Sequence, residues 1–152
     1  MAQSPVYRLG STLLLISPLL LGACSSQPVA RGIVNDNLAI CAKKPNCVSS
    51  SSLDEKHQFP ALKYLGTRDQ AKQRLLAVLN DFPNAEIVKQ DEDYIRVEFT
   101  TKIMRFVDDG EFLIGDDNIE VRSASRVGYS DLGKNRSRME KIKDAFEPCC
   151  NY

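Results

Sequence analysis

The sequence has little histidine, no excess charge and few long apolar runs. Its one histidine, His57, lies in a polar stretch, where a solvated side chain is more common than a metal ligand or a catalytic base. Its 20 Lys and Arg residues balance 20 Asp and Glu residues, which argues against general affinity for nucleic acid or for an anionic membrane surface. After residue 23, no apolar run approaches the length that crosses a bilayer.

The N-terminal segment has the layout of a secretory signal. Arg8 precedes an apolar run, Leu9 to Leu21, that is too short to cross a bilayer as a stable helix. The run ends in Leu21-Gly22-Ala23-Cys24, which resembles the lipobox of bacterial lipoproteins, where the cysteine receives a diacylglycerol and the chain is cut before it. The alternative is an ordinary signal peptide with a cysteine near its cut site. We expect residues 1–23 to be a lipoprotein signal peptide and Cys24 to carry the lipid.

The segment after Cys24 predicts a tether. Residues 24–40 include a small, polar and aperiodic stretch from Ser25 to about Asn37, and a flexible linker of that length spans about 20 Å. Ser25 replaces the Asp that resembles an inner-membrane retention signal, so this resemblance implies the outer membrane, facing the periplasm. We expect the membrane to be contacted through the lipid on Cys24, and residues 41–152 to form one domain with a core of ordinary size.

Four further cysteines are Cys41, Cys47, Cys149 and Cys150. An exported chain meets an oxidising compartment, so disulfides are expected. A bridge between the adjacent tail cysteines would be strained, because their Cα atoms lie about 3.8 Å apart. Either both tail cysteines reach Cys41 and Cys47, or Cys41 and Cys47 pair locally. We favour the local bridge. The spacing fits a four-cysteine zinc site poorly, and no cofactor is expected.

Hydrophobic periodicity predicts a helix, then strands, then a helix. Thr67 to Gln70 form a capping box before apolar residues at helical spacing, and Pro83 ends the run. Asn135 is expected to cap the second helix. Strands are predicted by alternating residues or by position between turns, at about 86–90, 95–99, 111–114 and 119–125. We therefore expect an α+β domain, an antiparallel sheet of about four strands with two helices packed on one face.

Three stretches carry a resemblance to a known family: Pro45–Ser50, Phe106–Asp109 and Arg122–Arg136. Together they resemble the family catalogued as domain of unknown function 1499, over roughly residues 41–146. The first cysteine pair looks like the pattern of that family, which supports a Cys41–Cys47 disulfide, whereas the tail pair does not belong to the pattern. The resemblance implies no reaction, because none is established for the family.

The longest stretch also contains three candidate ligand-binding arginines, Arg122, Arg126 and Arg136. The first two would project from the same face of a strand, about 13 Å apart. The third lies in the first turn of the next helix, whose N-terminus carries partial positive charge. Together they would form a pocket for a phosphate or a carboxylate. The alternative, which we favour, is that these arginines pair internally with carboxylates of Asp108, Asp109 and Asp131.

Three hypotheses for function follow. The first is a periplasmic binding or envelope-structural module for an anionic small molecule or a lipid headgroup, which uses Arg122, Arg126 and Arg136. The second is a protein-interaction module that meets another envelope protein. The third, least favoured, is a hydrolase built on Asp108, Asp109 and Asp131. Because adjacent strand residues point to opposite faces, the first two aspartates could share one centre only if the strand bends.

Overall fold

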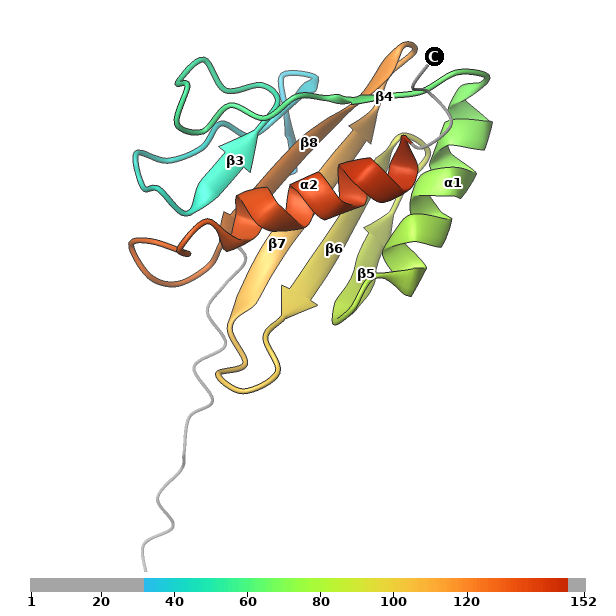
Figure 1. Cartoon of the computed structure of the whole chain (residues 1–152). Helices are drawn as coiled ribbons and strands as arrows, with labels where there is room; N and C mark the ends of the chain where they lie inside the picture. Colours follow the sequence, from blue (N-terminus) through green and yellow to red (C-terminus); the bar gives the residue numbers. More distant parts are fainter. Residues whose placement is uncertain (1–31, 148–152) are drawn as a thin grey trace, which may run out of the picture.

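The computed structural model describes residues 32–147 of the chain (Figure 1). The expected signal peptide, Cys24 and the two tail cysteines lie outside this range. The described part begins with four short strands, β1 (Ile33–Val34), β2 (Asn37–Leu38), β3 (Cys47–Ser49) and β4 (Leu62–Lys63). They are followed by α1 (Arg68–Asp81), β5 (Ala85–Gln90), β6 (Tyr94–Thr100), β7 (Val107–Ile114), β8 (Asn118–Ser125) and α2 (Lys134–Phe146). No helix in residues 32–147 is long and apolar enough to span a membrane.

The main sheet contains six strands in the order β3-β8-β7-β6-β5, with β4 also paired to β8. Its strand pairs are antiparallel. β3 and β4 lie along the same edge of β8, where Ser49 is opposite Arg122 and Leu62 is opposite Ile119. The prediction of an antiparallel α+β domain is confirmed, but the prediction of about four strands is wrong. β3 and β4 have three and two residues, too few to show alternation in the sequence.

A second, two-stranded sheet lies within the predicted tether. β1 and β2 form a hairpin in which Ile33 is opposite Leu38. Its two turn residues, Asn35 and Asp36, have φ values of 50° and 60°, as a two-residue type I′ turn requires. Leu38 is buried, and β2 packs against β7 and β8. Residues 33–38 are therefore part of the domain.

The hydrophobic core lies between the main sheet and the two helices, which cover the same face of the sheet (Figure 1). Ile95, Val97 and Phe99 alternate along β6 and are buried against the helices. The helix residues in this core are Ala71, Leu75, Leu79, Met139, Ile142 and Phe146. Burial of one large apolar side chain contributes about 1.5–3 kcal/mol to the free energy of unfolding. This layer therefore holds the two helices against the sheet.

The start of α1 agrees with the sequence, whereas the start of α2 does not. Thr67 Oγ1 accepts a hydrogen bond from Gln70 N, and Gln70 Oε1 accepts one from Thr67 N, which confirms the capping box. The N-cap of α2 is Gly133, with left-handed backbone. The prediction that Asn135 caps this helix is wrong, because its side chain is fully buried and Asp131 accepts the Asn135 N–H.

Candidate functional site

β7 and β8 carry buried polar side chains on both faces of the sheet. On the face covered by the helices are Asp108, Ser123 and Ser125. On the opposite face, which we name the hairpin face because β2 packs there, are Asp109, Glu111 and Arg122. Buried charges are costly unless they are paired. Each face of the sheet accordingly contains its own network of polar contacts.

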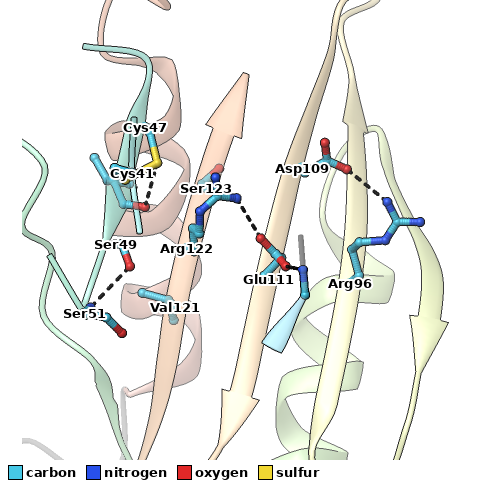
Figure 2. A network of polar contacts seen from close by, with 12 residues as sticks. Cys41, Cys47, Ser49, Ser51, Arg96, Asp109, Glu111, Val121, Arg122 and Ser123 are labelled. Carbon is cyan, nitrogen blue, oxygen red and sulfur yellow. Dashed lines mark hydrogen bonds and ion pairs between the residues drawn. A yellow bond between two sulfur atoms is a disulfide. The ribbon is translucent and has the colours of Figure 1, made fainter. Parts of the chain in front are cut away.

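Glu111 is the centre of the network on the hairpin face (Figure 2). Its Oε2 accepts a hydrogen bond from Arg122 Nη1 at 2.7 Å, and its Oε1 accepts from Tyr94 Oη at 2.6 Å and from Gly32 N at 3.0 Å. Burial and the hydrogen bond to Glu111 raise the pKa of Tyr94 far above its ordinary value. The Glu111 carboxylate therefore links the hairpin segment to β6 and β8.

Arg126 is the second arginine of this face, and its charge is balanced within the chain. Its Nε and Nη2 donate to the two oxygens of Asp109 at 2.8 and 2.7 Å, and Nη2 also donates to Glu98. The Asp109 hydrogen bonds hold the pKa of Arg126 above its ordinary value. Arg96 Nη1 lies 3.4 Å from the same Asp109 (Figure 2). Arg126 is thus a partner of two carboxylates.

Asn135 joins the network on the helix-covered face. Its Nδ2 donates to Asn46 O at 2.9 Å and to Ser125 Oγ at 3.0 Å. Its Oδ1 accepts from Ser123 Oγ at 2.6 Å and from Arg138 Nη1 at 2.8 Å. These bonds use both amide hydrogens and the carbonyl oxygen of the side chain. One buried amide therefore fastens α2 to β8 and to the chain that enters β3.

The structure separates the three predicted arginines. Arg122 and Arg126 project from the hairpin face, as predicted for the same face of one strand. Arg136 lies on α2, against the other face, where its Nη2 donates to Lys56 O at 3.0 Å and to Gln58 O at 2.9 Å. The described residues thus do not bring all three arginines to one pocket.

The three predicted aspartates also do not meet at one centre. Asp108 accepts from Arg138 Nη2 at 2.6 Å on the helix-covered face, whereas Asp109 lies on the hairpin face. Asp131 accepts from Gly133 N and Asn135 N before α2. Asp108 and Asp131 line a cavity of about 280 Å³ that does not include Asp109. No group of three His, Cys, Asp or Glu residues within residues 32–147 could hold a metal ion.

His57 is buried, so the expectation of a solvated side chain is wrong. Its Nε2 lies 3.1 Å from Lys44 O, and its Nδ1 lies 3.4 Å from Asp54 Oδ2. The polar neighbours in the sequence suggested exposure, but the ring packs between the segments that precede and follow β3. His57 is therefore a bridge between two loops.

Cys41 and Cys47 form a disulfide, with Cα atoms 5.7 Å apart. The favoured local pairing is thus present in the structure. The bridge joins the segment after β2 to the first residue of β3 and stands beside a cavity. Cys41 is one of the residues that line this cavity.

The cavity lies beside the hairpin and has a volume of about 770 Å³. Its apolar lining comes mainly from the segment after β1, and among residues 32–147 Arg122 is the one charged residue in its lining. The other lining residues are Val34, Asn35, Asn37, Leu38, Ala39, Ile40, Cys41, Ala42 and Ser51. The sequence indicated Arg122 but not the cavity, because the two strands of the hairpin have only two residues each and show no alternation in the sequence.

Arg122 has a further feature within this cavity lining. Its Nε is buried and has no hydrogen-bond partner, and it is the one such side-chain nitrogen or oxygen in the part of the chain that the structure describes. An unpaired buried donor costs about 1–3 kcal/mol. The arrangement therefore combines an apolar cavity with an arginine whose hydrogen-bonding capacity is not fully used.

A family model described as "Protein of unknown function (DUF1499)" matches residues 37–146. Neither a curated protein nor a solved structure matches the chain. The matched range begins at the first residue of β2 and ends at the last residue of α2. It contains the complete main sheet, both polar networks apart from Gly32, and most of the cavity lining.

Proposed function

Because the chain belongs to the DUF1499 family, whose description assigns no function, we propose that it is a ligand-binding module with its site in the cavity beside the hairpin. We further propose that it is exported and held by a lipid on Cys24 at the outer membrane, facing the periplasm. The signal-like N-terminus supports export, and the Cys41–Cys47 disulfide suits an oxidising compartment.

The observation that carries the binding proposal is the apolar cavity beside the hairpin, with the buried residue Arg122 in its lining. The positive charge of Arg122 is already balanced by Glu111, so the guanidinium lacks a hydrogen-bond acceptor rather than a counter-charge. Carboxylate and phosphate oxygens are the acceptors that an arginine guanidinium binds most strongly, so an anionic group is the polar end that would suit this lining. The cavity volume lies in the range of small-molecule sites, about 300–1,000 Å³.

The lining favours an amphiphile over a simple anion. Val34, Leu38 and Ile40 would contact an apolar chain, and Arg122 would bind its polar end. Arg126 and Arg136 have partners within the chain, so they would not contact this ligand directly. The proposal therefore narrows the predicted arginine site to Arg122 and names an acyl chain with an anionic headgroup as the class of ligand.

Calorimetric titration with dodecanoate, dodecyl phosphate and inorganic phosphate tests this proposal. Ala39→Phe would fill the cavity without removing the Arg122–Glu111 pair. Ala61→Phe is the matched control, because Ala61 is also partly exposed but does not line the cavity. We expect at least one amphiphile to bind the wild type and the control, and Ala39→Phe to abolish binding. The stronger probe would identify the headgroup as carboxylate or phosphate.

Two results would contradict the proposal. The first is binding of both amphiphiles that Ala39→Phe leaves unchanged, since the ligand would then lie elsewhere. The second is equal affinity for inorganic phosphate alone, since the apolar lining would then contribute nothing. Unfolding temperatures of both variants, measured alongside, separate a blocked cavity from a damaged fold.

A further inference from the structure

Two loops at one end of the main sheet expose apolar side chains. The loop between β6 and β7 and the loop between β8 and α2 lie where β6 and β8 end and β7 begins (Figure 1). Six large apolar residues in these loops are between 39 and 91 % exposed, and we name them the apolar tip: Ile103, Met104, Phe106, Val127, Tyr129 and Leu132. None of these six residues belongs to the hydrophobic core or to the lining of the cavity beside the hairpin.

The two loops meet and form one surface. Arg126 N donates to Val107 O at 3.2 Å, which holds the start of the second loop against the start of β7. Phe106 from the first loop and Val127 from the second line the same cavity of about 280 Å³. The two loops therefore lie side by side, with Phe106 and Val127 at the place where they meet.

Hydrogen bonds fix the loops in this arrangement. Thr101 N donates to Phe106 O, and Phe106 N donates to Thr101 Oγ1, each at 2.9 Å. Asn46 Nδ2 donates to Gly128 O at 3.0 Å and so attaches the second loop to the body of the domain. The tip is thus a built surface whose apolar side chains are directed outward.

Leu132 has the least favourable placement within the tip. Its φ is 54°, in the left-handed region that is unfavourable for residues other than glycine. Its side chain is also 89 % exposed, so contacts within the folded chain offset little of that cost. A strained backbone that directs a leucine into solvent points to a contact outside the chain.

The exposed charges around the tip are positive. Lys102 and Arg105 lie in the first loop, and Lys134 begins the helix after the second. No carboxylate forms a salt bridge with these three residues within residues 32–147. Lys134 also lines a neighbouring cavity of about 310 Å³ together with Ser137, Arg138 and Lys141. The acidic residue of the second loop, Asp131, accepts hydrogen bonds from Gly133 N and Asn135 N at the start of α2.

We propose that the apolar tip inserts into the interface of a bilayer that contains anionic lipids. Apolar side chains would enter the boundary between headgroups and acyl chains, while Lys102, Arg105 and Lys134 would bind lipid phosphates. Charge complementarity selects this occupant, because three cations that form no salt bridge within residues 32–147 lie in or beside the two loops. The chain has no net charge, so the attraction comes from this local arrangement. The proposal does not depend on a ligand in the hairpin cavity.

The absence of tryptophan from the chain provides a direct test. The full chain would be reconstituted on phosphatidylglycerol-rich vesicles with a single reporter, Leu132→Trp. The control is Leu53→Trp, at a fully exposed leucine outside the two loops. We expect the emission of the tip reporter to shift to shorter wavelength and to be quenched by brominated acyl chains, and the control emission to stay that of exposed tryptophan. Each reporter senses its own position, whatever attaches the chain to the vesicle.

Charge is tested in the same assay. Each Lys or Arg near an anionic membrane surface strengthens binding several-fold. Replacing Lys102, Arg105 and Lys134 together by Gln is therefore expected to weaken insertion about 100-fold. Phosphatidylcholine vesicles and high salt should likewise remove the shift. Three results would each overturn the proposal. They are emission of the Leu132→Trp reporter that stays that of exposed tryptophan, equal shifts at positions 132 and 53, and a shift of the same size on anionic and on zwitterionic vesicles. Circular dichroism of every variant verifies that the fold is retained.

Discussion

Glu111 on β7 and Arg122 on the adjacent strand β8 are directly opposite each other and form a buried ion pair. The same carboxylate accepts hydrogen bonds from Tyr94 Oη and from Gly32 N, so the pair couples two strands of the sheet to the segment that enters the hairpin. One charge cannot be removed without leaving the other buried and unbalanced.

We therefore expect Arg122→Ala to lower the free energy of unfolding by about 3–5 kcal/mol, the cost of breaking a buried ion pair from one side. Arg136→Ala is the control, because Arg136 is more exposed and binds backbone carbonyls. Its cost should be below about 1 kcal/mol. Urea unfolding of both variants measures the difference. Similar losses of unfolding free energy would show that the buried Glu111–Arg122 pair contributes no more to stability than the contacts of Arg136.

Tyr94 makes stability depend on alkaline pH. Its pKa is raised in the folded protein, so above pH 10 the unfolded chain loses this proton while the folded chain keeps it. The free energy of unfolding should then fall as pH rises, by about 1.4 kcal/mol per pH unit from this group. Below pH 10 the contribution is constant. In Tyr94→Phe this component of the slope should be absent.

Denaturant unfolding between pH 8 and 11 measures the slope. Tyr129→Phe is a suitable control, because Tyr129 is exposed in the loop before α2. It should keep the wild-type slope. If Tyr94→Phe keeps it as well, the phenol of Tyr94 ionises freely in the folded protein.

Gly110 has no room for a side chain. A Cβ atom at this position would lie 2.5 Å from Cε2 of Phe99 on the adjacent strand. Gly110→Ala should therefore destabilise the domain by about 1–3 kcal/mol through overpacking. Adding Phe99→Leu should cost less in the Gly110→Ala background than in the wild type. Thermal unfolding of the four proteins gives this coupling, and strictly additive losses would contradict it.

The disulfide is expected to support the cavity as well as the fold. Replacing Cys41 and Cys47 by Ser should lower the free energy of unfolding by about 2 kcal/mol, according to the loop-entropy relation. Because Cys41 lines the cavity, the same variant should bind the amphiphile more weakly. Reductant on the wild type should reproduce both effects. Unchanged affinity at lower stability would mean that the bridge acts on the fold alone.

The sequence predicted those features that depend on residues close together along the chain. The capping box at Thr67 locates the start of α1, and the alternation in β6 locates its buried face. The first half of β7 was not predicted, because Asp108 and Asp109 are polar and yet buried. Their burial depends on Arg138 and Arg126, which lie 30 and 17 residues further along the chain. A sequence pattern does not show such distant partners.

The candidate site was predictable to a similar extent. Arg122, one of the three arginines proposed from the sequence, lines the cavity, and the family resemblance supported the local disulfide. The cavity was missed because β1 and β2 have only two residues each, too few to show a strand pattern in the sequence. Arg136 was grouped with Arg122 because both flank one loop, but α2 packs on the other face of the sheet.

The two edges of the main sheet resist the addition of another strand. β5 forms one edge, and its register shifts between Ile87 and Lys89, which bends the row of free backbone groups. On the other side, β3 and β4 offer only three and two residues. Short or bulged edges hinder sheet-to-sheet polymerisation. Growth of a fibril by edge-to-edge pairing of these sheets is consequently disfavoured, even where copies of the domain are crowded together.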